Sequence, residues 1–172
     1  MACNSATLAG LAKDCTPSMG GIVEVYIANH DDVTEVTASA GKISQITMAS
    51  SAKFKKYQFN RNTGSLTSTY TFDKANGVQF VTSDLVLVFS RMESTKRVEM
   101  SALAVNDLAV ICKDANGTFF YLGMDEPVSA SAGDGQTGTA RTDANRYSIT
   151  LEDISKEMPY EVEESIIAGL IA

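Results

Sequence analysis

Alternation of apolar and polar residues dominates the chain and predicts a mainly β protein. From Ile22 onward, Val23, Val25 and Ile27 share one face of an expected strand, with polar residues between them. Clusters of Asn, Asp and Gly separate it from the later apolar segments. Further strands are expected at 33–38, 42–48, 53–60, 65–73, 78–81, 85–89, 108–113, 118–122 and 146–151. We expect a β-sandwich or open barrel of about eight strands with one central helix and long loops.

The clearest local pattern lies between residues 53 and 73. Residues 65–73 alternate strictly, with Leu66, Ser68, Tyr70 and Phe72 on one face and Ser and Thr on the other. The turn at 61–64 precedes them, so we expect a β-hairpin with 53–60 as its first strand. The lysines of its first strand have two interpretations. They protect a solvated sheet edge, or they contact an acidic patch on a neighbouring subunit.

Three segments depart from the strand pattern. Apolar spacings of three and four predict a helix at 93–105. Residues 123–145 are rich in Gly, Ser, Ala, Thr and Asp and are expected to form a long, partner-ordered loop. The apolar stripe that ends at Leu170 predicts a short C-terminal helix. That tail either packs on its own core or docks on a neighbouring copy. We expect an arm at 1–21, a β-sandwich domain at 22–160 and an apolar tail at 161–172.

Charge and composition narrow the function. The 172 residues include 14 Lys+Arg and 21 Asp+Glu, which gives a net charge of −7 at pH 7. An acidic chain without a Lys/Arg run is a poor surface for stable nucleic-acid binding. No apolar run reaches the roughly 18 residues of a membrane span, and the N-terminus lacks the pattern of a signal peptide. We therefore expect a cytosol-like compartment and three reduced cysteines, with Cys112 in a buried strand; a Cys3–Cys15 bridge is the alternative.

The residues that could carry catalysis are few. The single histidine, His30, lies in a polar turn, where a solvated side chain is expected. Paired carboxylates sit at adjacent positions, which point to opposite faces of a strand. Residues 133–138 match the spacing G-x-G-x-x-G without the flanking strand and helix that a dinucleotide site needs. The turn at 114–117 begins like a calcium loop but lacks its final Glu. We expect no enzyme, no metal and no cofactor.

A series of motifs stands out between residues 107 and 160. A strand ends in Asp114-Ala115-Asn116-Gly117 and is followed by an aromatic strand and Leu122-Gly123. Then come Thr137-Gly138-Thr139-Ala140, Tyr147-Ser148-Ile149-Thr150-Leu151 and the segment from Lys156 to Pro159. This order of motifs resembles the tail tube proteins of tailed bacteriophages, in particular those of phages that infect gut Bacteroidetes. The upstream segments agree with that family only in the order of their elements.

The resemblance implies a structural protein of the virion tail that is assembled in the bacterial cytoplasm. It implies hexameric rings whose inner strands join into one barrel, and stacked rings that conduct DNA. Loops and terminal arms would reach between rings. The expected partners are further copies of the chain and other phage tail proteins, with DNA only as passing cargo and no membrane. The acidic balance agrees with this role, since a basic lumen would retain DNA.

Three groups of residues are the candidate contacts under this hypothesis. The lumen- or ring-facing hairpin, 53–71, contributes Lys53, Lys55, Lys56, Tyr57, Phe59 and Tyr70. The inter-ring loop, 129–142, contributes Ser129, Asp134, Gln136 and Arg141. The tail contributes Ile166, Ile167 and Leu170. Two alternatives are a head–tail connector, stopper or capsid decoration protein, and a β-sandwich that binds a small ligand or carbohydrate. The absence of Trp counts against the latter.

Overall fold

The computed structural model describes residues 7–172, which form eleven strands, two α-helices and one short 3-10 helix. The helices are η1 (His30–Asp32), α1 (Ser94–Val105) and α2 (Glu164–Leu170). The strands are β1 (Ile22–Asn29), β2 (Val33–Ser39), β3 (Lys42–Met48), β4 (Lys55–Tyr57), β5 (Ser65–Asp73), β6 (Val78–Ser90), β7 (Leu108–Asp114), β8 (Phe119–Leu122), β9 (Ser129–Gln136), β10 (Arg146–Ser155) and β11 (Tyr160–Val162).

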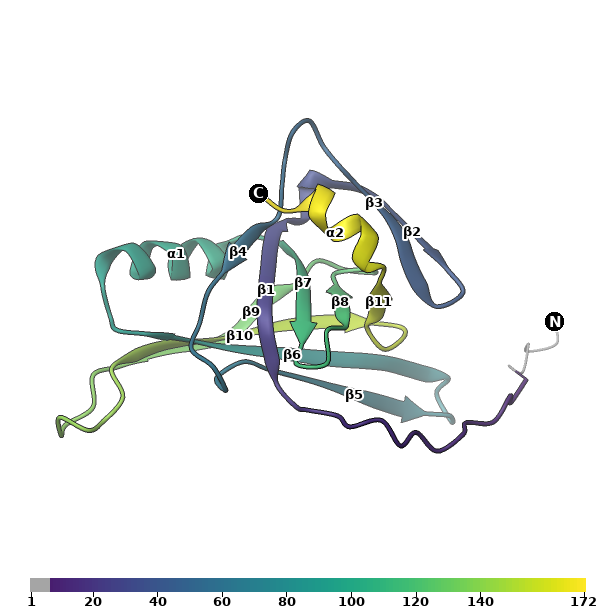
Figure 1. The fold of residues 1–172 in the computed structure, drawn as a ribbon, viewed down its shortest axis with the longest axis horizontal. Coiled ribbons are helices and arrows are strands. Elements are labelled where there is room, and N and C mark those ends of the chain that lie inside the picture. Colours follow the sequence, from purple (N-terminus) through teal and green to yellow (C-terminus); the bar gives the residue numbers. More distant parts are fainter. Residues whose placement is uncertain (1–6) are drawn as a thin grey trace.

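The strands form two sheets that pack face to face, so the predicted mainly β sandwich is confirmed. One sheet has seven strands in the order β2-β3-β11-β8-β7-β1-β4, and the other has four in the order β5-β6-β10-β9. All pairings are antiparallel except that of β11 with β3. The strands of the two sheets cross at a steep angle, and the sheets do not close into a barrel (Figure 1).

The seven-stranded sheet is buried on both faces at its centre, which explains the continuous apolar sequence of β7. Val25 and Ile27 of β1 belong to the core between the two sheets. Tyr26 and Ala28 of the same strand belong to a second core on the opposite face, which α2 covers. Cys112 is fully buried in β7, as predicted, and burial raises the pKa of its thiol to about 12. Cys15 is exposed, and Cys3 lies outside the described residues.

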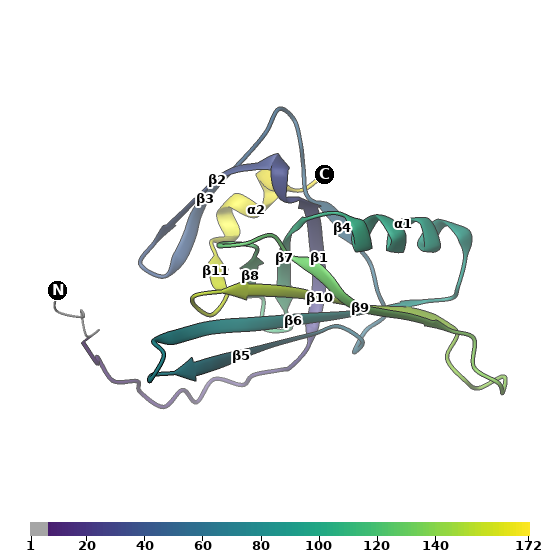
Figure 2. The same cartoon turned by 180° about the vertical axis from the view of Figure 1, so that it is seen from behind.

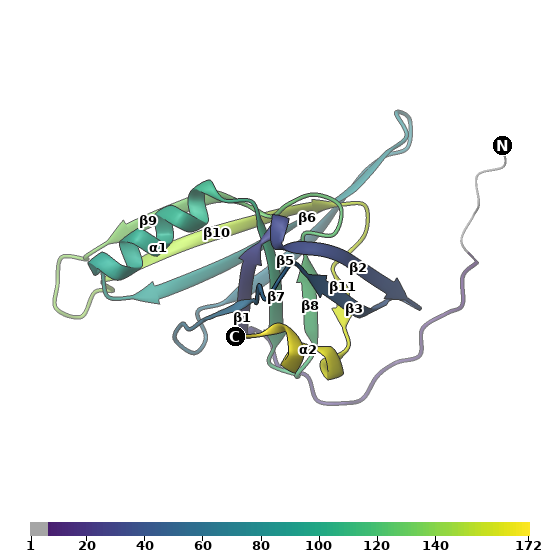
Figure 3. The same cartoon turned by 90° about the horizontal axis from the view of Figure 1, so that it is seen from above.

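Helix α1 confirms the helix predicted at 93–105. Its Leu103 is buried in the core between the sheets, and Met100 packs against the same core. The helix lies along β9 and β10 at one end of the four-stranded sheet (Figure 3). Among the described residues, no helix is long and apolar enough to span a membrane.

The hairpin predicted at 53–73 is wrong. Its first half, β4, pairs with β1 in the seven-stranded sheet, while β5 pairs with β6 in the other sheet. The β5–β6 register is uninterrupted over nine residue pairs, from Ser65 opposite Val86 to Asp73 opposite Val78. The separate strands expected at 78–81 and 85–89 are one strand of 13 residues, long enough to support this pairing. The turn at 74–77 therefore closes the real hairpin.

The long loop predicted at 123–145 is also wrong over much of its length. Residues 129–136 form β9, which pairs with β10 at the edge of the four-stranded sheet. Seven of its eight residues are exposed, and small residues with two glycines make up most of it. Low β-propensity concealed the strand in the sequence, because the β10 backbone and not the side chains of β9 holds it in place. The remaining loop segments are 123–128 and 137–145.

The C-terminal tail packs on its own core, which was one of the two interpretations left open. Ile167 and Leu170 of α2 are 5% and 6% exposed, and Ile166 is partly buried against the same core. The Phe54 N–H donates to the carbonyl of Leu170 at 2.9 Å, and Ala172 N–H donates to the carbonyl of Phe54 at 3.0 Å. Ile167 and Leu170 are therefore intramolecular core residues and do not present a surface to another copy.

The described part of the N-terminal arm, residues 7–20, is exposed and contains neither helix nor strand. Leu8 and Leu11 are almost fully accessible to solvent. Asn116, in the β7–β8 turn, anchors the arm where it meets the body: its side-chain oxygen accepts the N–H of Met19 at 2.8 Å, and its amide donates to the Met19 carbonyl at 3.1 Å. The Asp-Ala-Asn-Gly turn of the sequence motif thus holds the base of the arm.

Candidate assembly surfaces

The four-stranded sheet ends in two long edge strands, β5 and β9, of nine and eight residues. Each pairs within the chain along one side only. Their free sides expose backbone N–H and C=O groups that can pair with another strand. Because β5–β6, β6–β10 and β10–β9 are all antiparallel, the two edge strands run in opposite directions.

The outer face of this sheet, away from the core between the sheets, is rich in threonine and also carries apolar side chains, among them Phe80, Val86, Val88 and Ile154. No helix or other strand of the described chain covers it (Figure 2). The residue register places the following polar side chains on this face: Ser65, Thr67, Thr69, Thr71, Thr82, Asp84, Ser129, Asp134, Gln136, Arg146, Ser148, Thr150 and Glu152. Asp84 and Glu152 lie directly opposite each other on the two central strands. The middle of the face therefore carries two adjacent negative charges.

We predict that Asp84→Asn stabilises the protein. Like charges directly opposite on neighbouring strands are unfavourable, so removal of one should raise the free energy of unfolding by about 0.2–1 kcal/mol. The gain should shrink at high salt, because the pair is partly exposed. Urea unfolding at low and high salt measures it. Asp134→Asn is the matched control, since Asp134 faces Ser148 and not a carboxylate. Equal gains in the two variants would contradict the prediction.

The lysine-rich segment around β4 makes contacts within the chain. Lys53 donates to the carbonyl of Gly169 in α2, and Lys56 pairs with Glu24 of β1 at 2.8 Å. That ion pair raises the pKa of the Lys56 ammonium and lowers the pKa of the Glu24 carboxyl. Lys55 is exposed on β4. The segment therefore ties the edge of the seven-stranded sheet to its neighbours.

The aromatic residues assigned to the same hairpin are divided between different places. The Tyr57 hydroxyl donates to Glu99 of α1 at 2.5 Å, and burial raises the pKa of Tyr57. Phe59 packs against the core between the sheets. Tyr70 lies in the other sheet, stacked on Phe72 with ring centroids 5.1 Å apart. The structure thus does not bring the six predicted residues into one site.

The predicted inter-ring loop is likewise divided, because Ser129, Asp134 and Gln136 belong to β9 and only Arg141 lies in the loop 137–145. Arg141 is exposed. Within this loop the Asp143 carboxylate accepts the N–H groups of Thr139 and Ala140, at 2.8 and 2.7 Å. These bonds lower the pKa of Asp143. The Thr-Gly-Thr-Ala motif is therefore the tip of a turn closed by Asp143.

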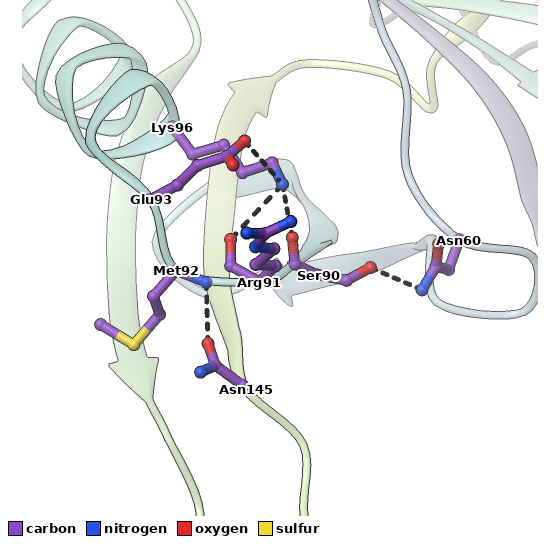
Figure 4. Close-up of polar contacts among 7 residues, drawn as sticks. All are labelled: Asn60, Ser90, Arg91, Met92, Glu93, Lys96 and Asn145. Atoms are coloured by element: carbon purple, nitrogen blue, oxygen red, sulfur yellow. Dashed lines mark hydrogen bonds and ion pairs between the residues drawn. The ribbon is translucent and has the colours of Figure 1, made fainter.

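A polar corner at the start of α1 holds the base of this loop (Figure 4). The Asn145 side-chain oxygen accepts the N–H of Met92 at 2.7 Å. The Lys96 ammonium pairs with Glu93 at 3.1 Å and donates to the Ser90 carbonyl at 2.6 Å. The sequence does not point to Asn145, because its partner Met92 lies 53 residues away along the chain and only the fold brings the two together. The partners of Lys96 are close to it in sequence. The corner joins the end of β6, the helix start and the loop.

The described residues hold no group of three or more His, Cys, Asp or Glu side chains that could bind a metal ion. His30 lies on η1, partly exposed. The features that distinguish this molecule are accordingly its sheet edges and its bare sheet face. Comparison with protein-family models, curated proteins and solved structures found no match.

Proposed function

We propose that this protein is a virion structural protein, a tail tube subunit that self-assembles into stacked rings around a DNA-conducting lumen. The observation that supports this most strongly is the four-stranded sheet, with two long free edges and an uncovered outer face. A monomer seldom leaves two such edges open, since each is a template for further strand pairing.

The direction of the edge strands favours a closed ring. In copies that all face the same way, β9 of one copy beside β5 of the next continues the antiparallel order, because these strands run in opposite directions. A repeated head-to-tail contact of this kind closes into a ring when the rotation between copies permits it. The four-stranded sheets would then form one continuous barrel, and the hexamer implied by the resemblance is one such closure.

The outer face suits the lining of a conduit for DNA. Its threonine and serine hydroxyls hydrogen-bond to water, and the Asp84–Glu152 pair repels phosphate groups. A basic lining would instead hold the nucleic acid by counterion release. We therefore propose that β5, β6, β10 and β9 line the lumen, in place of the hairpin expected at 53–71. Of these four strands, only β5 belonged to that expected hairpin.

Negative-stain electron microscopy of the purified protein over a range of concentrations tests the proposal. Rings that stack into tubes are the expected result. Isolated rings that never stack would favour the connector or stopper alternative, whose subunits also need paired edges. A protein that stays monomeric at high concentration, measured in parallel by light scattering, would overturn the proposal.

A further inference from the structure

The carboxyl group of Asp153 is buried between the two sheets with one oxygen unpaired. It lies on the inner face of β10 and is 1% exposed. Its Oδ1 accepts the N–H of Gly123 at 3.0 Å, whereas Oδ2 has no hydrogen-bond partner in residues 7–172. The hydroxyl of Tyr121, also 1% exposed, is the other buried side-chain polar atom that lacks a partner there. Unpaired buried polar groups are rare and costly in native proteins.

Asp153 holds the segment through which the chain passes from one sheet to the other. Residues 123–128, here called the crossover, leave β8 and lead into the edge strand β9. Gly123, at the start of the crossover, has φ +102°, a conformation that favours glycine. The Asp153–Gly123 bond therefore joins the four-stranded sheet to the beginning of the crossover.

Two carboxylates near Asp153 disfavour its negative charge. Asp125 and Glu126 lie on the crossover, and both act to raise the pKa of Asp153. On β6, Ser83 lies opposite Asp153, and its hydroxyl is 2.7 Å from the hydroxyl of Ser68. The nearby cation is Lys156, whose ammonium is 4.0 Å from Asp125 and largely exposed.

Burial is the largest of these effects and raises the pKa of Asp153 to about 6. The N–H of Gly123 opposes it, as does Ser155 on the same strand, while the carboxylates of Asp125 and Glu126 reinforce it. Burial raises the pKa of Tyr121, and the charge of Asp153 adds to this effect. The protein thus binds a proton at Asp153 in a pH range where an ordinary carboxyl is already ionised.

We propose that Asp153 is a proton switch that controls the crossover. In its neutral form the carboxyl keeps the Gly123 bond without repelling Asp125 and Glu126, so the crossover stays packed against β10. In its ionised form a buried charge faces those two carboxylates and loosens the crossover, and with it the start of β9. The switch is a property of the single chain and does not depend on ring assembly.

The direction in which pH changes the stability follows from the difference between the pKa values of Asp153 in the folded and unfolded states. Folding favours the protonated form, so the stability that this group contributes falls as pH rises from about 4 through 6 and levels off above about pH 7. A carboxyl whose pKa is 3.8 in the unfolded chain and about 6 in the folded protein makes the folding equilibrium constant about tenfold smaller at pH 7.5 than at pH 5. Groups with a lowered pKa, such as Glu24 and Asp73, have the opposite effect on stability, because the stability that they contribute is lost as pH falls.

Urea unfolding of the full chain at pH 5 and pH 7.5 tests the switch in the wild type and in Asp153→Asn. The wild type should lose about tenfold in the folding equilibrium constant relative to the variant as pH rises. Glu152→Gln is the matched control, because it removes a carboxylate from the next residue on the opposite face of β10, and it should keep the wild-type dependence. Identical pH dependence in the wild type and Asp153→Asn would overturn the proposal.

Amide hydrogen exchange locates the change. At pH 7.5 the crossover and the start of β9 should exchange faster in the wild type than in Asp153→Asn, with the β5–β6 hairpin unchanged. Uniform exchange differences over the whole chain would overturn the local switch. If Asp153→Asn fails to fold, the ¹³C shift of the wild-type Asp153 carboxyl decides: a midpoint near pH 6 supports the switch, and one near 3.8 refutes it.

Discussion

Two adjacent proline substitutions in β5, Thr69→Pro and Tyr70→Pro, should separate folding from ring assembly. Neighbouring residues of a strand direct their N–H groups to opposite sides, so one proline removes a donor to β6 and the other removes a donor at the free edge. The variant that loses the donor to β6 should unfold at a lower temperature. The variant that loses the donor at the free edge should fold like the wild type and fail to form rings, because proline on an edge prevents continued strand pairing.

Each of the two variants serves as the control for the other, since both residues are exposed in the middle of β5. Thermal unfolding identifies which variant retains the β5–β6 pairing, and negative-stain microscopy counts its rings. If the variant with wild-type stability still forms rings in normal number, β5 is not an assembly edge. The proposed ring contact would then be excluded even though rings exist.

Replacement of Ile167 by alanine should lower the free energy of unfolding by about 2–5 kcal/mol. Its side chain is 5% exposed and belongs to the core that α2 forms with the outer face of the seven-stranded sheet. Truncation removes buried methyl groups and leaves a cavity in this second core, on the face of the seven-stranded sheet opposite the core between the sheets. We expect the whole domain to lose stability, because β3, β8 and β11 contribute to the same core.

Ile166→Ala is the matched control for this substitution. Ile166 precedes Ile167 on the same helix but is only partly buried, so its truncation should cost clearly less. Urea unfolding of the two variants measures the difference. Equal losses would contradict the assignment of Ile167 to the core. A loss seen only in assembled rings would instead support the hypothesis that the tail docks on a neighbouring copy.

Much of the fold could be predicted where a strand carries its own signal. Periodicity predicts the first strand, the strands at 33–38 and 42–48 and the helix α1, and a continuous apolar run predicts the buried β7. Apolar residues that face a core recur at every second position in a strand and at every third or fourth position in a helix. This spacing is visible in the sequence. The strict alternation of β5 was likewise recognised, and its faces are those observed.

The errors occurred where pairing, rather than periodicity, decides the structure. The proximity of 53–60 to 65–73 along the chain favoured a hairpin, yet β4 binds β1 through Val25 and Ile27, and β5 binds β6. β9 escaped detection because its small residues carry no strand signal and its hydrogen bonds come from β10. In both cases the strand could pair with several segments, some of them distant in the sequence. A local pattern does not show which of these segments is the partner.

The sequence by itself determined that this protein is mainly β, that α1 forms, that Cys112 is buried and that the turn at 114–117 closes a hairpin. These features depend on local propensity and on which residues avoid water. Only the tertiary structure decided which strands occupy the sheet edges, that the tail is buried in its own core and that Asp153 lies between the sheets with one carboxyl oxygen unpaired. Edges and buried charges exist only after distant segments have packed together, so no local pattern specifies them.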